Sequence, residues 1–217
     1  MPDFRAMLEF PGGIYAITPE TADTERLLSQ VEAALAGGAA AVQYRDKSGD
    51  VARRHEQASE LVALCRRFGV PLIVNDDLRL ADLTGADGVH LGRDDGSLRE
   101  ARIILGRGKF IGASCYQSLE LAQAAQAAGA DYVAFGSFFP SPTKPAAGRA
   151  DAALLREAAR ALSIPIVAIG GITPANAPAL LDAGADSLAV LSALFGAPDI
   201  RAAAHALNQL FATESEQ

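Results

Sequence analysis

Short, mostly apolar runs alternate along the chain with longer alanine-rich stretches whose apolar positions recur at helical spacing. The short runs have the composition of strands that are covered on both faces. We predict strands at 14–18, 41–45, 72–75, 88–91, 110–114, 132–136, 166–170 and 187–191. We predict helices at 23–36, 51–68, 98–105, 118–128, 151–162, 175–182 and 200–211, with a short one at 78–83.

A strand followed by a helix, repeated along the whole chain, predicts parallel strands joined by right-handed crossovers. A chain of 217 residues suits a closed (β/α)8 barrel, and an open doubly wound sheet is the alternative. We expect one barrel domain over 1–217, in which residues 1–12 form an N-terminal extension.

A small motif recurs before every second predicted strand and favours the barrel. It reads AGGA at 36–39, TGAD at 84–87, AGAD at 128–131 and AGAD at 183–186. Its glycine suits the left-handed conformation that ends a helix. The recurrence is typical of a barrel built from repeated quarters, although the motif is also common chemistry for a helix-to-strand loop.

Charge and cysteine content exclude several classes of protein. The formal net charge of −7 is opposite in sign to that of a general nucleic-acid binder. Cys65 and Cys115 build neither a disulfide framework nor a zinc site. The sequence has no apolar run of membrane-spanning length and no signal-peptide core near its start. We therefore expect a cytoplasmic protein with no membrane partner, and a homo-oligomer is compatible with the sequence.

Polar residues gather where the predicted strands end, which is the catalytic end of such barrels. Gln43, Arg45 and Lys47 alternate along the second strand and so share a face. Two inward-pointing cations are costly to desolvate without an anion, so an anionic ligand is predicted. The alternative is a solvated turn with an ordinary salt bridge to Asp46.

Asp76 and Asp95 follow the third and fourth strands, which are neighbours in a barrel. Two carboxylates and the phosphate of a substrate are typical ligands of Mg²⁺, so this pair predicts a magnesium site. Asp76 could instead cap the next helix, although Asp77 suits that role better.

Gly170 and Gly171 end the seventh strand, and a helix is predicted to start near Thr173 and Pro174. Together with Ser192 after the eighth strand, this loop predicts a second, metal-free phosphate site. His90 is either a hydrogen-bonded interior group or a catalytic one, and Cys115 is interpreted as a packing residue.

These motifs resemble the thiamine phosphate synthase family. The resemblance rests on QYRDK at 43–47, NDD at 75–77, GVHLGRDD at 88–95, SPTK at 141–144 and AIGGIT at 168–173. It implies a (β/α)8 barrel that joins 4-amino-5-hydroxymethyl-2-methylpyrimidine diphosphate to 4-methyl-5-(2-phosphoethyl)thiazole, with release of pyrophosphate. It also implies a dissociative mechanism, in which a pyrimidine carbocation forms and the thiazole nitrogen captures it.

The resemblance further implies a role for each matching residue. Mg²⁺ would be held by Asp76 and Asp95, and the catalytic residues would be Arg45, Lys47, Ser114 and Lys144. The pyrimidine diphosphate would contact Gln43, Arg45, Lys47, Asn75, Ser114 and Lys144. The thiazole phosphate would contact Ser141, Thr143, Gly171, Leu191 and Ser192.

The sequence departs from the family pattern at Arg93, where relatives usually have Gln, and at Tyr116, where many have His. The missing His argues against the sister activity of a thiazole tautomerase. That tautomerase, another phosphate-binding barrel isomerase and a non-catalytic binder of thiamine phosphates are the alternatives.

Overall fold

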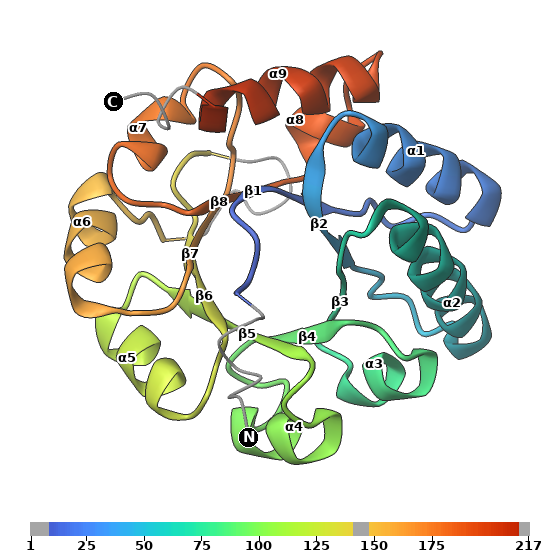
Figure 1. Cartoon of the computed structure of the whole chain (residues 1–217), viewed down its shortest axis with the longest axis horizontal. Coiled ribbons are helices and arrows are strands. Elements are labelled where there is room, and N and C mark those ends of the chain that lie inside the picture. Colours follow the sequence, from blue (N-terminus) through green and yellow to red (C-terminus); the bar gives the residue numbers. More distant parts are fainter. Residues whose placement is uncertain (1–8, 141–147, 213–217) are drawn as a thin grey trace.

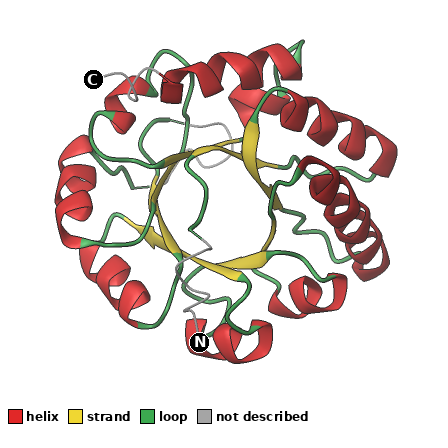
Figure 2. Cartoon of the chain, in the orientation of Figure 1, coloured by secondary structure: helices red, strands yellow, loops and turns green. Residues whose placement is uncertain are grey.

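The computed structural model describes residues 9–140 and 148–212, and in it eight parallel strands close into a barrel in chain order (Figures 1 and 2). Each strand pairs with the next, and β8 pairs with β1. The strands are β1 Gly13–Ile17, β2 Ala39–Tyr44, β3 Leu72–Asn75, β4 Gly88–Leu91, β5 Phe110–Tyr116, β6 Tyr132–Gly136, β7 Ile166–Ile169 and β8 Ser187–Val190. The predicted (β/α)8 barrel is therefore confirmed, and the open sheet is excluded.

Helices surround the barrel on the outside (Figure 2). They are α1 Thr24–Ala36, α2 Val51–Phe68, α3 Leu78–Thr84, α4 Leu98–Leu105, α5 Leu119–Ala127, α6 Ala152–Ala161, α7 Pro178–Leu181, α8 Ser192–Phe195 and α9 Ile200–Ala212. Apolar side chains between sheet and helices form one continuous core. No helix in the described ranges is long and apolar enough to cross a membrane.

A second core fills the inside of the barrel. Phe10 belongs to it, although the residue lies in the stretch that we set apart as an extension. Its ring stacks on Tyr132 at a centroid distance of 3.9 Å and meets Phe110 edge to face. Since Phe110 begins β5, Phe10 closes the barrel at the end where the strands start.

The recurrent motif stabilises that same end. Each of its three aspartates accepts a hydrogen bond from a backbone N–H at the start of the preceding strand. The pairs are Asp87 with Leu72, Asp131 with Ile111 and Asp186 with Ile166. The carbonyls of those three strand residues accept from the backbone N–H groups of the same aspartates. The glycines before them have φ between 67° and 100°, as a left-handed helix end requires.

The helices depart from the prediction by more than one residue at two places. The helix predicted at 175–182 shrinks to α7, because Pro178 has no N–H to donate to the preceding turn. Thr173 and Pro174 lie in a turn instead, in which the Asn176 side chain accepts from the Thr173 N–H. The short helix α8 directly follows β8 and was not predicted.

Candidate active site

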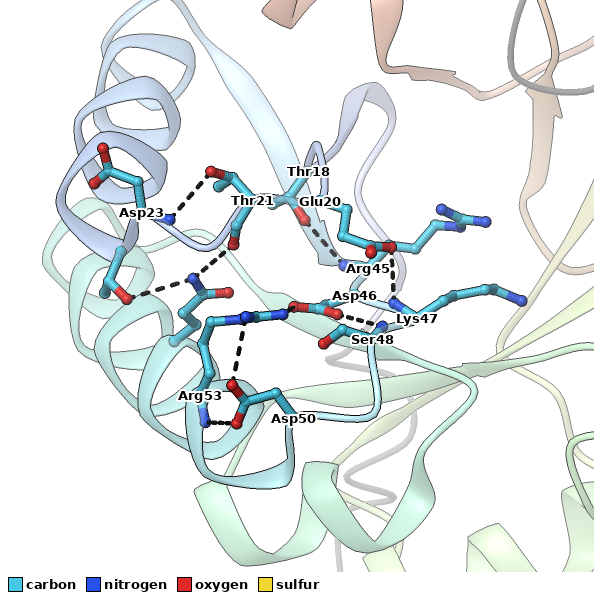
Figure 3. Close-up of polar contacts among 12 residues, drawn as sticks. Thr18, Glu20, Thr21, Asp23, Arg45, Asp46, Lys47, Ser48, Asp50 and Arg53 are labelled. Carbon is cyan, nitrogen blue, oxygen red and sulfur yellow. Dashed lines mark hydrogen bonds and ion pairs between the residues drawn. The ribbon is translucent and has the colours of Figure 1, made fainter.

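In the loop after β2, successive side chains point to opposite sides. Hydrogen bonds to side chains of the loop after β1 hold the backbone of this loop in place. Thr18 Oγ1 accepts from the Arg45 N–H at 2.9 Å, and Glu20 Oε2 accepts from the Lys47 N–H at 3.1 Å (Figure 3). The Arg45 and Lys47 side chains extend in the same direction, away from α2 (Figure 3). Gln43, two residues before Arg45, is buried inside the barrel.

Asp46 lies between these two cations but bonds elsewhere. Its carboxylate accepts from the Ser48 N–H and pairs with Arg53 of α2 at 3.5 Å. These bonds and the nearby Arg53 hold the pKa of the Asp46 carboxyl below its usual value, against the opposing effect of burial. The predicted alternative of a salt bridge from Arg45 or Lys47 to Asp46 is therefore wrong, because the ion-pair partner of Asp46 is Arg53.

Lys47 reaches instead to the end of the next strand. Its Nζ lies 3.1 Å from Asp76 Oδ2. Asp76 has a φ of 64°, a left-handed conformation that costs an aspartate about 1 kcal/mol, and its N–H donates to the His90 carbonyl. Such a partly exposed ion pair adds little to stability, so stability does not explain the geometry. The helix cap is Asp77, whose carboxylate accepts from the Leu80 N–H as predicted.

Asp95 joins the same group from the loop after β4. Its Oδ2 accepts from the Gly92 N–H at 2.9 Å, and its carboxyl lies near that of Asp76. Partial burial and this neighbouring carboxyl raise the pKa of Asp95 above its ordinary value. An open cavity of about 480 Å³ adjoins the group and is lined by Asp46, Lys47, Ser48, Arg54, Asn75, Asp76, Asp77, Leu78 and Asp95.

The paired carboxylates fit a magnesium ion. A site that brings two carboxyl groups near each other gains from a divalent cation, which removes their repulsion. Mg²⁺ needs only one or two protein carboxylates, because water and substrate phosphate complete its shell. No cluster of three or more His, Cys, Asp or Glu suitable for a metal occurs among residues 9–140 and 148–212.

Inside the barrel, a chain of hydrogen bonds joins two predicted site residues. Gln43 Nε2 donates to Tyr15 Oη at 2.8 Å, and Tyr15 Oη lies 2.8 Å from Tyr132 Oη. Tyr132 Oη is 3.1 Å from His90 Nδ1, and His90 Nε2 is 2.9 Å from Ser114 Oγ. Burial lowers the pKa of His90 to about 4, so the ring is neutral.

Asn75 lies beside this inner group, because it is the register partner of His90 across β3 and β4. The two tyrosines were missed in the sequence. Their alternation with other apolar residues on β1 and β6 carries no sign of which face is interior, since both faces of these strands are buried.

The glycines after β7 make room for another loop. Gly170 and Gly171 have φ values of 109° and 65°, and a Cβ on either would collide with the segment after β6, at Ser137 or at Phe139 and Pro140. Leu191 and Ser192 follow β8 at the same end of the barrel. The predicted residues Ser141, Thr143 and Lys144 lie outside the described residues.

Parallel strands with cations and paired carboxylates at their C-terminal ends define a (β/α)8-barrel enzyme with a site for charged ligands. A family model described as thiamine monophosphate synthase matches residues 14–194. The chain belongs to this family.

Related proteins are similar to this chain along nearly its whole length. A thiamine-phosphate synthase of Thiobacillus denitrificans is 79% identical and covers 97% of this chain and 100% of the relative. The thiamine-phosphate synthase of Methylobacillus flagellatus is 57% identical and covers 92% of this chain and 95% of the relative. The solved thiamine phosphate pyrophosphorylase of Pyrococcus furiosus has a TM-score of 0.81 and 36% identity, and covers 97% of this chain and 98% of its own. The chain is thus a transferase of thiamine biosynthesis.

Proposed function

We propose that this chain condenses 4-amino-5-hydroxymethyl-2-methylpyrimidine diphosphate with 4-methyl-5-(2-phosphoethyl)thiazole, giving thiamine phosphate and pyrophosphate. The observation that carries the proposal is the meeting of Lys47, Asp76 and Asp95 beside one cavity. A lone cation would suit any anion, whereas a cation beside paired carboxylates suits a metal-bound diphosphate.

Arg45 and Lys47 are proposed to bind the diphosphate and to balance the charge that grows on it as it leaves. Their shared direction and the backbone hydrogen bonds from Thr18 and Glu20 support this role, because a preorganised cation needs no reorientation during the reaction. We propose the same role for Lys144, on its match to the family motif. Gln43, Asn75 and Ser114 would hold the pyrimidine diphosphate at the inner wall of the barrel.

Asp76 and Asp95 are proposed to hold Mg²⁺. When bound there, the metal would supply positive charge to the phosphate oxygens of the leaving group. Lys47 lies 3.1 Å from Asp76 and so keeps a second positive charge beside the metal ligands.

The thiazole phosphate is proposed to bind where β7 and β8 end, at Gly171, Leu191 and Ser192, with Ser141 and Thr143 from the loop after β6. Support comes from the close packing of the segment 137–140 against Gly170 and Gly171, which brings the two loops together. Alignment of the two reactants then replaces any need for a nucleophile or general base of the protein. We propose that the reaction takes place in the cytoplasm.

The test is an assay of the purified chain with both precursors, with and without Mg²⁺, that measures thiamine phosphate and pyrophosphate. We expect both products in equal amounts, and only with the metal. Isomerisation of a thiazole phosphate without condensation would favour the tautomerase alternative. Binding of thiamine phosphate without turnover would favour a non-catalytic relative, and either result would contradict the proposal.

A further inference from the structure

The hydrogen-bond chain inside the barrel has a direction that can be derived by counting hydrogens. The Gln43 amide donates to Tyr15 Oη, so the single hydroxyl hydrogen of Tyr15 is available for Tyr132. Tyr132 Oη then accepts from Tyr15, and its own hydrogen is available for His90 Nδ1. His90 Nδ1 is thereby an acceptor.

Because Nδ1 accepts from Tyr132, it carries no hydrogen, and the single hydrogen of the ring is on Nε2. His90 Nε2–H therefore donates to Ser114 Oγ across 2.9 Å. Ser114 Oγ accepts this bond and keeps its own hydrogen, for which no further partner occurs within the described ranges 9–140 and 148–212. Ser114 is thus left as a hydrogen-bond donor.

We propose that Tyr15 and Tyr132 are positioning residues: their hydroxyl pair orients the Gln43 amide, holds His90 in the Nε2–H tautomer, and leaves the Ser114 hydroxyl to donate to the substrate. The inference rests on the proposed function, in which Ser114 contacts the pyrimidine diphosphate. A donating hydroxyl suits the acceptor atoms of that substrate, which are its phosphate oxygens and pyrimidine ring nitrogens, and does not suit its exocyclic amino group.

The packing around the hydroxyl pair supports a dedicated role. Tyr15 and Tyr132 are almost fully buried, and burial raises the pKa of both phenols, so neither loses its hydrogen near neutral pH. Gly112 makes the space for the central link, because a Cβ there would lie 2.4 Å from Tyr132 Oη and 2.6 Å from His90 Nδ1. A purely apolar interior would need none of these four hydrogen bonds.

The reversed chain is chemically possible and gives the opposite prediction. If the Gln43 amide accepted from Tyr15, every hydrogen would shift by one bond, His90 would carry its hydrogen on Nδ1, and Ser114 would have to donate to His90. The tautomer of His90 therefore distinguishes the two directions without any measurement of activity.

The test is ¹⁵N NMR of the full chain in which the exposed His55 and His205 are replaced by Gln, so that His90 gives the only ring signals. We expect the Nε2–H tautomer. An Nδ1–H tautomer would overturn the proposal, whether or not the chain makes thiamine phosphate. Absence of turnover with the expected tautomer would count against the proposed function and leave the direction of the chain supported.

Kinetics test the effect on the substrate. Tyr132→Phe keeps the ring but removes the donor to His90, so we expect a mixture of His90 tautomers and a fall of about tenfold in kcat/KM for the pyrimidine diphosphate. The KM for the thiazole phosphate should stay unchanged. The matched control is Tyr44→Phe, which removes another buried hydroxyl, bonded to Gln57 at 2.9 Å outside the barrel, and should leave both constants unchanged.

Tyr15→Phe interrupts the chain one bond earlier and serves if Tyr132→Phe does not fold. An unchanged tautomer together with unchanged kinetics in a folded variant would show that the tyrosines are structural only, which would also overturn the proposal.

Discussion

The Arg93 guanidinium lies over the ring of Tyr116, 5.1 Å from its centroid, and the Arg93 N–H donates to the Tyr116 hydroxyl. These are the two positions at which we expected the sequence to depart from the family pattern, and the structure brings them into contact. In this structure the guanidinium contacts the Tyr116 ring, and among the described residues it forms no ion pair with Asp76 or Asp95.

This contact predicts that Arg93→Gln alters stability more than catalysis. We expect kcat to change by less than about threefold. A double-mutant cycle with Tyr116→Leu should give a coupling free energy of about 0.5–1 kcal/mol, measured by urea unfolding. A change of more than tenfold in pyrophosphate inhibition by Arg93→Gln would instead place the guanidinium at the leaving group.

The paired carboxylates predict that the adjacent residues Asp94 and Asp95 differ sharply in their importance for activity. Asp95→Asn and Asp76→Asn should each lower kcat by about 10²–10³ and weaken activation by Mg²⁺, because each removes a charged ligand of the proposed metal. The matched control is Asp94→Asn, an exposed neighbour, which should keep its activity. Titration of kcat against Mg²⁺ makes the comparison, and equal effects at 94 and 95 would remove Asp95 from the metal site.

The proposed role of the lysines predicts a split between the kinetic constants. Lys47→Ala and Lys144→Ala should lower kcat strongly and leave the KM for the thiazole phosphate nearly unchanged, because both cations would act on departing pyrophosphate. Steady-state kinetics with each substrate varied in turn provide the measurement. A defect confined to thiazole binding would contradict the assignment of either lysine.

Residues at the end of the barrel where the strands begin should affect stability and not activity. Asp131→Ala removes the acceptor of the Ile111 N–H and an ion-pair partner of Arg102, so we expect a loss of about 1–3 kcal/mol in the free energy of unfolding. We expect kcat to be unchanged. Asp82→Ala, at an exposed carboxylate of α3, is the control and should change the free energy of unfolding by less than about 0.5 kcal/mol.

The buried cysteines predict a loss of stability in alkali. Burial raises the pKa of both Cys65 and Cys115 from 9.0 to about 12, so between these values the unfolded chain releases protons that the folded chain keeps. Stability therefore falls as the pH rises above about 9, by up to about 1.4 kcal/mol per pH unit for each thiol. Cys65→Ala with Cys115→Ala should make the fall shallower in urea titrations at several pH values. An equal slope would mean that the thiols do not contribute.

Much of the fold could be predicted because local pattern and burial agree. The bounds of β3, β4, β6, α2 and α4 match the predicted ranges, since each apolar run ends at a residue with a clear capping or turn preference. The prediction failed at α7 and α8, where a proline and a tight loop decide the helix limits rather than periodicity.

The site was predictable only where residues follow strand ends directly. Lys47, Asp76 and Asp95 lie together because adjacent parallel strands finish side by side, which the barrel topology implies. The pairing of Tyr15 with Tyr132 spans 117 residues and depends on which strand face is interior. The contact of Arg93 with Tyr116 depends on side-chain direction in two loops, which no spacing in the sequence specifies.

The central claim is that cations and a divalent metal at the strand ends balance the charge of a departing diphosphate. A crystal structure of the chain with Mg²⁺ and pyrophosphate tests it most directly. The account predicts the metal on the carboxylates of Asp76 and Asp95, with pyrophosphate oxygens shared between the metal, Arg45 and Lys47. Pyrophosphate bound away from β2, β3 and β4, or a metal on neither carboxylate, would contradict it.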